Sequence, residues 1–366
     1  MNDSFATSPL FERVERARRR KHKIRETHIT LAHGSGGRAM HDLVEGLFLE
    51  YFRNPLLEKL EDQAVFEVKA ASRMAFTTDS YVVDPIFFPG GDIGELAVHG
   101  TVNDLAMSGA RPLYLSAGFI LEEGFPIEDL RRVCASMQRA AEEAGVQIIT
   151  GDTKVVQRGG ADKIFINTAG IGVIENQTNI SSQNARPGDK VIVSGTIGDH
   201  GTTIMISRGE LELETDIESD SASLHLLVAD IIDEAERRGA IDAIHCLRDP
   251  TRGGVATTLN EIAMSSDVSI EIREDLIPVR ENVKGACEIL GLDPLYVANE
   301  GKLVAVVSGE IADAVVERMR RNQHGTGACI IGEVKAEPQG IVSMTTGFGG
   351  TRIVDMLAGE QLPRIC

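Results

Sequence analysis

The chain divides at a polar segment, ENQTNISSQNARPGD (175–189), whose Asn, Ser, Pro and Gly residues are typical of a linker or interdomain crossing. On both sides of it, strand-like apolar runs alternate with amphipathic helical patterns, which predicts two α/β domains. A length of 366 residues agrees, because it exceeds what one core usually supports. Before the segment we expect a hairpin over 60–79, helices over 92–109 and 127–145, and strands over 146–156 and 162–174. After it we expect strands over 190–195, 268–272, 302–309 and 328–336, and helices over 221–239, 253–265 and 311–321.

Composition and charge exclude several classes of protein. Apolar residues make up 42% of the chain and charged residues 25%, as in an ordinary globular protein. The formal net charge of −18 disfavours binding to nucleic acid or to an anionic membrane. The sequence contains no apolar run of about 18 residues, the length that predicts a membrane span. The basic segment RVERARRRKHKIRETH (13–28) lacks the apolar core of a secretory signal, so we predict a cytoplasmic protein with a basic arm over 1–27.

The five cysteines form no C-x-x-C pair and are odd in number, which indicates neither a zinc site nor a disulfide framework. Cys134 and Cys287 lie on the apolar stripes of helical patterns, and Cys246 and Cys329 lie in strand-like runs. Cys366 ends the chain in QLPRIC and has no burial pattern. We therefore expect a flexible tail over 347–366 whose terminal thiol is unsheltered and open to oxidation.

A glycine cluster, HGSGGRAMHDLV (33–44), runs into a helical pattern. Its backbone N–H groups could wrap an anion near the start of the helix. A plain flexible turn explains the same residues. The segment matches neither G-x-x-x-x-G-K-[ST] nor a strand-borne G-x-G-x-x-G, which disfavours the common nucleotide-binding folds.

Several carboxylates stand where burial is otherwise expected. Burying a carboxylate is costly unless it is paired or coordinated, and oxygen ligands from several segments suit Mg²⁺ bound together with nucleotide phosphates. Each residue taken singly also fits a turn or a helix cap. Asp104 fits this least, since it lies within a helical pattern with Gly100 and Thr101 one turn earlier. The set comprises Asp62, Asp79, Asp104, Asp152 and Asp249.

Three further motifs have ordinary structural explanations. DPTRGG (249–254) is typical of a turn before a helix. ANEGKL (298–303) places Glu300 and Lys302 before a strand, where they would form a surface ion pair. SGTIGDHG (194–201) is typical of a strand followed by a glycine-rich loop.

Taken together, these motifs resemble the HypE family of hydrogenase maturation factors, in the superfamily of aminoimidazole ribonucleotide synthetase (PurM) and selenophosphate synthetase. The matching segments are HGSGGR, TTDS, TVNDLAMSGARP, GDTKV, SGTIGDHG, DPTRGG, ANEGK and the terminal PRIC. They run in the same order from about residue 28 to the C-terminus. The resemblance implies a homodimer of two-domain PurM-like α/β subunits, with domains over 28–180 and 181–346 and with ATP and Mg²⁺ in the cleft between them.

The resemblance also implies roles for individual residues. The metal and phosphate carboxylates would be Asp62, Asp79, Asp104 and Asp249. The residues around the nucleotide would be Gly34, Gly36 and Gly37 of the loop together with Asn103, Asp152, Thr153 and Asp199. Cys366 would carry the substrate, with Glu300 as general base and Lys154 facing the reacting tail.

The chemistry that the resemblance implies accounts for the terminal thiol. A HypF-type carbamoyltransferase would place a carbamoyl group on Cys366, and this chain would act as an ATP-dependent lyase that dehydrates the group to a thiocyanate. Phosphorylation of the carboxamide oxygen turns a poor leaving group into phosphate, and Mg²⁺ neutralises charge on the transferring phosphoryl. The cyano group would pass to iron on a HypC–HypD complex, destined for a [NiFe]-hydrogenase.

Two other functions stay open. An ATP-dependent synthetase of the same superfamily, forming selenophosphate or thiamine phosphate, would not use a terminal cysteine. Selenophosphate synthetases resemble one another in a Cys near the N-terminal glycine loop, where this chain has His33 and no Cys before Cys134. A noncatalytic carrier would hold the carbamoyl group on Cys366 without turnover, but it would not need the acidic residues and the glycine loop.

Overall fold

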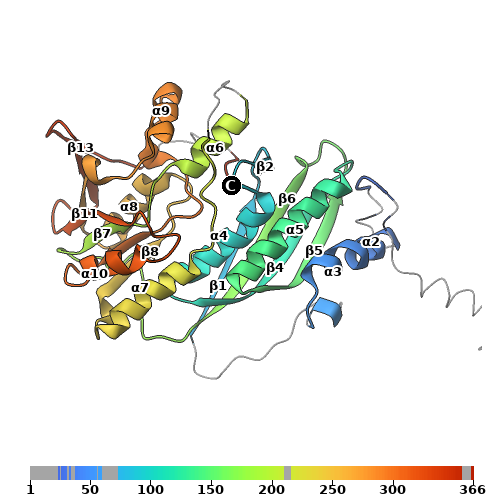
Figure 1. Ribbon diagram of the computed structural model, residues 1–366, viewed down its shortest axis with the longest axis horizontal. Coiled ribbons are helices and arrows are strands. Elements are labelled where there is room, and N and C mark those ends of the chain that lie inside the picture. The colour runs from blue at the N-terminus through green and yellow to red at the C-terminus, as the bar shows by residue number, and fades with distance from the viewer. Residues whose placement is uncertain are drawn as a thin grey trace, which may run out of the picture.

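The computed structural model describes residues 24, 26–30, 33, 38–55, 57–59, 73–209, 216–356 and 364–366. It shows two α/β domains, each a sheet covered by helices, as the sequence predicts (Figure 1). Gly34, Gly36, Gly37 and Asp62 lie outside the described residues, as does the first strand of the predicted hairpin. No helix in the described part of the chain is long and apolar enough to cross a membrane.

The first domain contains a four-stranded sheet in the order β1-β6-β4-β5. Strands β4 and β5 are parallel and the other pairs antiparallel. The side chains of β1 alternate, so Asp79 and Tyr81 face the helices while Phe76 faces away. The elements are α2 (Arg38–Leu43), η2 (Val44–Phe48), α3 (Leu49–Phe52), η3 (Leu57–Lys59), β1 (Arg73–Tyr81), β2 (Phe87–Phe88), β3 (Gly91–Asp92), α4 (Ile93–Met107), β4 (Arg111–Glu122), α5 (Ile127–Ala144), β5 (Gln147–Val156) and β6 (Ile164–Ile174).

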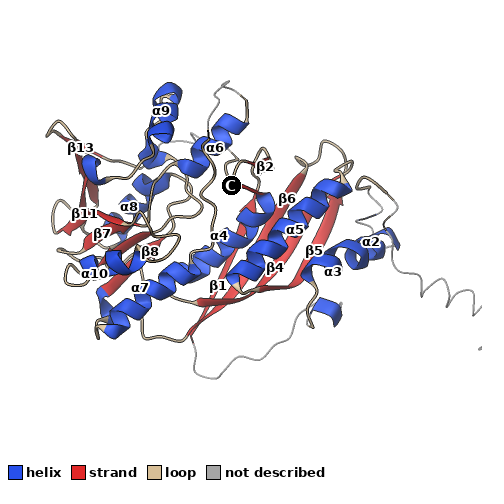
Figure 2. Ribbon diagram, in the orientation of Figure 1, coloured by secondary structure: helices blue, strands red, loops and turns tan. Residues whose placement is uncertain are grey.

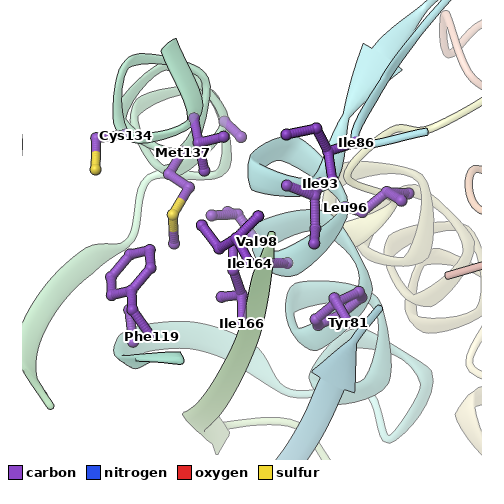
Figure 3. Close-up of a cluster of buried hydrophobic side chains, with 14 of the residues drawn as sticks. Tyr81, Ile86, Ile93, Leu96, Val98, Phe119, Cys134, Met137, Ile164 and Ile166 are labelled. Atoms are coloured by element: carbon purple, nitrogen blue, oxygen red, sulfur yellow. The ribbon is translucent and has the colours of Figure 1, made fainter. Parts of the chain in front are cut away.

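Helices α4 and α5 cover one face of this sheet (Figure 2). Asp92 caps α4 by accepting hydrogen bonds from Gly94 N (2.7 Å) and Glu95 N (3.2 Å). Helix α5 ends at Gly145, whose φ of 66° suits a residue without a side chain. Figure 3 shows side chains of the core between these layers, including Tyr81, Leu96, Phe119, Met137 and Ile166.

The second domain contains a seven-stranded sheet in the order β13-β12-β9-β11-β7-β10-β8. Strand β7 (KVIV) is buried on both faces, with Val191 and Val193 in the core beneath α8 and Ile192 in the core beneath α7 and α10. The elements are β7 (Lys190–Val193), α6 (Asp199–Ser207), α7 (His225–Arg237), η4 (Ile241–Ala243), β8 (Ile244–Arg248), α8 (Gly254–Ser265), β9 (Ser269–Arg273), η5 (Glu274–Leu276), α9 (Glu281–Leu290), η6 (Pro294–Tyr296), β10 (Val304–Val307), α10 (Ala312–Met319), β11 (Cys329–Lys335), β12 (Ile341–Thr345) and β13 (Thr351–Ile353).

The domains meet where α4 packs against α7 and β8. Ala106 and Met107, at the end of α4, belong to the same buried cluster as Leu227 and Ile231 of α7. Helix α4 is therefore buried on almost every side, because it lies between its own sheet, α5 and the second domain. It brings residues of the first domain directly to those of the second.

The structure corrects the predicted tail in two respects. Thr351–Ile353 pair with β12 as β13, and Val354 is fully buried, so residues 347–356 belong to the second domain. Ile365 and Cys366 are also buried, with 3% and 8% of their surface exposed, within the core cluster of the first domain. The thiol expected to be unsheltered is covered because the end of the chain lies against the segment that follows β1.

Candidate active site

Carboxylates from distant segments gather where α4 meets the second domain. Asp79 lies near the end of β1, Asp104 on α4, and Asp249 directly after β8. Burial raises the pKa of Asp104, and Asp79 raises it further, while a hydrogen bond from Thr77 Oγ1 (2.7 Å) opposes the rise. Burial raises the pKa of Asp249 to about 7, with further contributions from Asp104 and Asp79. These effects show that the three predicted carboxylates lie close enough to repel one another.

Glu300 joins this group from the ANEGKL segment. Its side chain is 4% exposed, and Oε1 has no hydrogen-bond partner among the described residues. Burial raises its pKa well above the ordinary value, and Asp249, Asp220 and Asp79 raise it further. Its backbone is fixed, because Glu300 N donates to Asp220 Oδ1 (3.1 Å). The four acidic side chains Asp79, Asp104, Asp249 and Glu300 are called the carboxylate cluster below.

The surface ion pair expected between Glu300 and Lys302 does not form. Lys302 Nζ instead lies 3.0 Å from Asp220 Oδ2, and both side chains of that pair are largely buried. Since Lys302 pairs with Asp220, it does not neutralise the charge of Glu300. The positive charge of Arg252 lowers the pKa of Glu300.

The C-terminal residues dock beside the carboxylate cluster of their own subunit. Val82 N donates to Cys366 O (3.1 Å), and Asp84 N donates to Arg364 O (3.2 Å). His200 Nε2 lies 2.8 Å from Ile365 O, and Arg208 donates to Arg364 O (2.8 Å). These contacts hold main-chain oxygen atoms and are independent of the side chains at the end of the chain.

Two side chains of the docked segment add further contacts. Ile365 packs into the core of the first domain, and burying a side chain of this size contributes roughly 1.5–3 kcal/mol. Arg364 pairs with Asp162 and lies 3.8 Å from Asp84. Ile365 and Arg364, directly before the cysteine, thus help to hold the C-terminal segment in its docked position.

The docked thiol lies within the electrostatic reach of the carboxylate cluster. Burial raises the pKa of Cys366, and the negative charges of Glu300 and Asp79 raise it further, while Arg252 lowers it. Arg252 also lies 3.5 Å from Asp79. The sequence analysis did not single out Arg252, because DPTRGG is typical of an ordinary turn. In the structure this residue is the cation that faces both the thiol and the acids.

Known proteins resemble this chain over nearly its whole length. The family model for the N-terminal domain of AIR synthase related proteins matches residues 60–174, and the model for the C-terminal domain matches residues 186–345. Carbamoyl dehydratase HypE of Bradyrhizobium diazoefficiens is 57% identical over 351 residues, covering 96% of this chain and 100% of the relative. Carbamoyl dehydratase HypE of Escherichia coli is 48% identical over 342 residues, covering 92% and 99%.

The chain belongs to the carbamoyl dehydratase HypE family.

Solved structures support the same assignment. A HypE crystal structure in complex with ATP matches with a TM-score of 0.87 at 54% identity, covering 92% of this chain and 99% of that one. A HypE–HypF complex matches with a TM-score of 0.74 at 50% identity, covering 86% and 99%. A thiamine monophosphate kinase bound to AMPPCP matches with a TM-score of 0.58 at 19% identity, which shows a shared fold alone. The predicted two-domain PurM-like fold and the predicted family are confirmed.

Two residues assigned from the HypE resemblance lie away from the docked thiol. Asp152 and Lys154 lie on β5, which β6 and β4 separate from β1 and Asp79. Their side chains are each 68% exposed and lie 3.5 Å apart. Lys154 is opposite Ile120 on β4, on the face that the helices do not cover, whereas Thr153 is buried beneath the helices. The expectation that Lys154 faces the tail is therefore not met within one subunit. Lys154 lies on β5 at one edge of the sheet, whereas the tail docks directly after β1, the strand at the opposite edge.

Asn103 and Asp199 are buried, and each has partners within the protein. Asn103 Nδ2 donates to Ala222 O (3.0 Å) and Glu300 O (3.3 Å), and its Oδ1 accepts from Leu224 N (2.7 Å). Asn103 thus joins α4 to the second domain and holds the main chain of Glu300. Asp199 accepts from Thr196 Oγ1 (2.6 Å) and lies 3.4 Å from Arg280. Burial raises the pKa of Asp199.

The carboxylate cluster has the donor chemistry that Mg²⁺ prefers, since its ligands are all oxygens and their mutual repulsion would be relieved by a cation. Among the described residues, however, no group of three or more His, Cys, Asp or Glu side chains is arranged to hold a metal ion by itself. This is compatible with Mg²⁺, which is usually bound by one or two carboxylates with waters and nucleotide phosphates.

Proposed function

We infer that this chain dehydrates a carbamoyl group on its own Cys366 to a thiocyanate, at the expense of ATP. The observation that carries this function is the docking of the C-terminal thiol beside Glu300, Asp79 and Arg252 of the same subunit. A protein that only carried a carbamoyl group on its terminal thiol would not need this cluster of acids beside the thiol. The relatives that share up to 57% of its residues are named as carbamoyl dehydratases.

The reaction removes one water from an S-carbamoyl group. The carboxamide oxygen attacks the γ-phosphoryl group of ATP, which releases ADP and leaves an O-phosphorylated imidate on sulfur. The carboxamide nitrogen loses one N–H proton as the imidate forms, and loss of the second then forms the C≡N bond as the C–O bond breaks and phosphate departs. The balance is carbamoyl cysteine plus ATP to thiocyanate, ADP and phosphate.

Individual residues carry the steps that the protein itself performs. Val82 N and His200 hold the main chain of the tail, which keeps the carboxamide near the acids. Arg252 stabilises negative charge that develops beside the sulfur. We propose Glu300 as the group that accepts the N–H proton, because it is buried, lies near the thiol and has an unpartnered oxygen.

We propose that Asp79, Asp104, Asp249 and Asp62 hold Mg²⁺ together with the nucleotide. When bound, Mg²⁺ supplies positive charge that neutralises the transferring phosphoryl group. The glycine loop with Gly34, Gly36 and Gly37 is proposed to cover the phosphates, and Asp152, Thr153 and Asp199 keep their proposed places around the nucleotide. The HypE–ATP complex among the matching structures supports nucleotide binding.

Partners follow from the chemistry of the tail. A HypF-type carbamoyltransferase is proposed to load Cys366, which the matching HypE–HypF complex supports. The docked residues Arg364, Ile365 and Cys366 must leave their contacts for this loading and again for transfer of the cyano group to iron on a HypC–HypD complex. We place these steps of [NiFe]-hydrogenase maturation in the cytoplasm.

We also propose that the chain forms a homodimer through the uncovered face of its first sheet. Large apolar side chains are exposed on this face, namely Met74 (47%), Phe76 (72%) and Ile120 (42%). Clustered apolar residues of this size on a sheet are usually covered in the assembled protein. A second subunit on this face would also cover Asp152 and Lys154, which lie too far from Cys366 within one subunit.

The test is a single-turnover reaction followed by intact-mass analysis. Protein carbamoylated at Cys366 is mixed with ATP and Mg²⁺, and we expect it to lose the mass of one water while ADP and phosphate are released. Cys366→Ala should neither load nor react, and Asp79→Asn should load but not lose water. Normal dehydration by Asp79→Asn would show that the metal-site assignment is wrong. Consumption of ATP on a free small molecule would support a small-molecule synthetase, and loading without water loss would support a carrier.

A further inference from the structure

His200 connects the docked tail to the segment that joins α6 to α7. It lies in the first turn of α6 and is fully buried. Its Nε2 lies 2.8 Å from Ile365 O, and its Nδ1 lies 2.8 Å from Ser219 Oγ. Ser219 belongs to residues 216–224, which form neither helix nor strand and are called the α6–α7 segment below. The position of the tail therefore depends on this segment through one imidazole ring.

The hydrogen bonds around His200 define which ring nitrogen carries the proton. Ile365 O can only accept, so Nε2 must be the protonated nitrogen. Ser219 Oγ accepts from Ser221 N (3.2 Å), which leaves its own proton for Nδ1. Burial lowers the pKa of His200 and so favours the neutral ring, although Asp220 and the bond to Ile365 oppose this. By donating to Nδ1, Ser219 favours the tautomer that binds the tail.

The first domain fixes both the ring of His200 and the position of Ser219. The ring of Phe88 meets the ring of His200 edge to face, with centroids 5.7 Å apart. Ser219 N donates to Pro89 O (2.9 Å). Gly90 has a φ of 81°, and an added Cβ there would stand only 2.8 Å from both Ser219 N and Ser219 O. The two backbones thus lie closer than a side chain at residue 90 would permit, and Ser219 is held firmly in place.

The next residue of the α6–α7 segment fixes Glu300. Asp220 Oδ1 accepts from Glu300 N (3.1 Å), and Asp220 Oδ2 pairs with Lys302. An added Cβ at Gly301 would overlap Asp220 O, so this close approach also requires glycine. The consecutive residues Ser219 and Asp220 therefore determine two positions, that of the tail and that of the proposed base.

We propose that Ser219 is a positioning residue that acts through His200 to hold the carbonyl group of Ile365. The α6–α7 segment then sets the carboxamide on Cys366 in register with Glu300. Because Ile365 directly precedes Cys366, a shift of its carbonyl group shifts the sulfur as well. The holding of the tail follows from the hydrogen bonds alone, whereas the register with Glu300 rests on the proposed function. The two parts are therefore tested by different measurements.

Alkylation of Cys366 with iodoacetamide measures the holding of the tail, because a docked thiol is sheltered from the reagent. Ser219→Ala leaves Nδ1 of His200 without a partner and the ring without its favoured tautomer. A neutral hydrogen bond changes an equilibrium about two- to tenfold, so we expect the full-length variant to be alkylated faster by that factor. Ser221→Ala, in the same segment, is the matched control and should keep the wild-type rate. Its hydroxyl bonds Nδ1 of another buried histidine, His99 (3.1 Å), whose Nε2 has no partner among the described residues.

Two substitutions of His200 test the assigned proton. A glutamine amide can reach the position of Nε2 and donate to Ile365 O, whereas the shorter asparagine amide reaches only the position of Nδ1. We expect His200→Asn to speed alkylation of Cys366 about tenfold and His200→Gln to retain most of the protection. Adding Ser219→Ala to His200→Asn should cause little further increase, because Ser219 acts through His200. The buried Cys134 reports any global unfolding in the same peptide map.

Single-turnover dehydration of carbamoylated protein measures the register with Glu300. We expect the rate to fall about tenfold in Ser219→Ala, because a small misplacement of a reacting group is costly, and to be unchanged in Ser221→Ala. The affinity for ATP should be the same in both variants.

Each outcome separates this inference from the proposed function. Unchanged alkylation in Ser219→Ala, or equal acceleration in Ser221→Ala, would overturn the role of Ser219. Fast alkylation of His200→Gln would overturn the assigned proton, whether or not His200→Asn folds. Faster alkylation of Ser219→Ala with a normal dehydration rate would overturn the register with Glu300. Failure of the wild-type protein to lose water would overturn the proposed function, and the alkylation rates would still decide how the tail is held.

Discussion

Arg252 Nη2 lies 3.5 Å from Asp79 Oδ1, and the same guanidinium interacts with the thiol of Cys366. Arg252, which precedes α8 of the second domain, thus interacts both with a carboxylate of the first domain and with the terminal thiol docked against that domain. It lowers the pKa of Cys366 and of Glu300, against the larger effects of burial and of the neighbouring acids. Arg252 thereby favours the charged forms of Cys366 and Glu300, on which the proposed loading and proton transfer depend.

Replacing Arg252 is expected to slow dehydration. In Arg252→Ala, Glu300 loses the nearby positive charge, so a smaller fraction of it is ionised at pH 7 and able to accept a proton. We expect the dehydration rate to fall about tenfold or more, because general-base catalysis typically contributes a factor of that size or larger. Single-turnover water loss measured by intact mass checks this. Arg273→Ala removes an exposed arginine that pairs with Asp275 and should leave the rate unchanged. An unaltered rate in Arg252→Ala would contradict the role given to its charge.

The docked thiol is expected to react slowly with alkylating reagents. Thiolates are the reactive form, and burial together with Glu300 and Asp79 raises the pKa of Cys366. Arg208 donates to Arg364 O and to Asp84 O, and a hydrogen bond from a charged group contributes about 1.5–3 kcal/mol. In Arg208→Ala the undocked fraction should therefore rise about tenfold or more, and alkylation of Cys366 with it.

Peptide mapping after timed exposure to iodoacetamide measures this rate for Cys366 alone. Cys134, Cys246 and Cys287 are buried in the folded protein and serve as internal standards for global unfolding. Arg273→Ala is again the matched surface variant. Fast alkylation of the wild-type thiol, at the rate of the unfolded chain, would show that the docked position is not the resting one.

Stability should depend on pH through Asp249. Its pKa is raised from 3.8 to about 7 in the folded protein, so the folded state binds the proton more tightly than the unfolded state. This contribution to stability is complete below about pH 4 and is lost as the pH rises through about 7. Asp104 and Glu300 shift in the same direction.

Asp249→Asn removes this dependence. In buffer without Mg²⁺ and nucleotide, the difference in unfolding free energy between Asp249→Asn and wild type should grow in favour of the variant from pH 5 to pH 8. Urea unfolding at both pH values measures it, with the exposed Asp242→Asn as control. A difference that is constant with pH would contradict the crowding of charge around Asp249.

Much of the site could be predicted because its parts are local sequence features. Asp79, Asp104 and Asp249 each stand out as acids where burial is otherwise expected, and the structure brings them together. Glu300, which joins them, was expected in a surface ion pair from its local sequence and received its role only from the HypE resemblance. Most helices were also predicted within a few residues, since amphipathic spacing and caps such as Gly145 are readable along the chain.

The rest depends on contacts between distant segments. Strand β4 (Arg111–Glu122) was not predicted, and the order β1-β6-β4-β5, which separates Lys154 from Asp79, is a property of pairing that no single segment specifies. Burial of Ile365 and Cys366 could not be read from so short a segment, because it arises from a site formed by the first domain and α6.

The position of Lys154 leads to a final prediction about assembly. If Lys154 serves the reaction, it must do so at the site of a second subunit, because its own β5 is at the edge of the sheet opposite β1.

Phe76→Glu places a charge on the uncovered face, where Phe76 is 72% exposed, and should convert a dimer to a monomer in light scattering after size-exclusion chromatography. Thr345→Glu, at an exposed position in the second domain, should leave the mass unchanged. Mixing then tests the shared site: Lys154→Ala subunits, which keep Cys366, should regain dehydration when exchanged with Cys366→Ala subunits, which keep Lys154. A monomeric wild-type protein with full activity, or no recovery in mixed dimers, would place Lys154 outside the reaction.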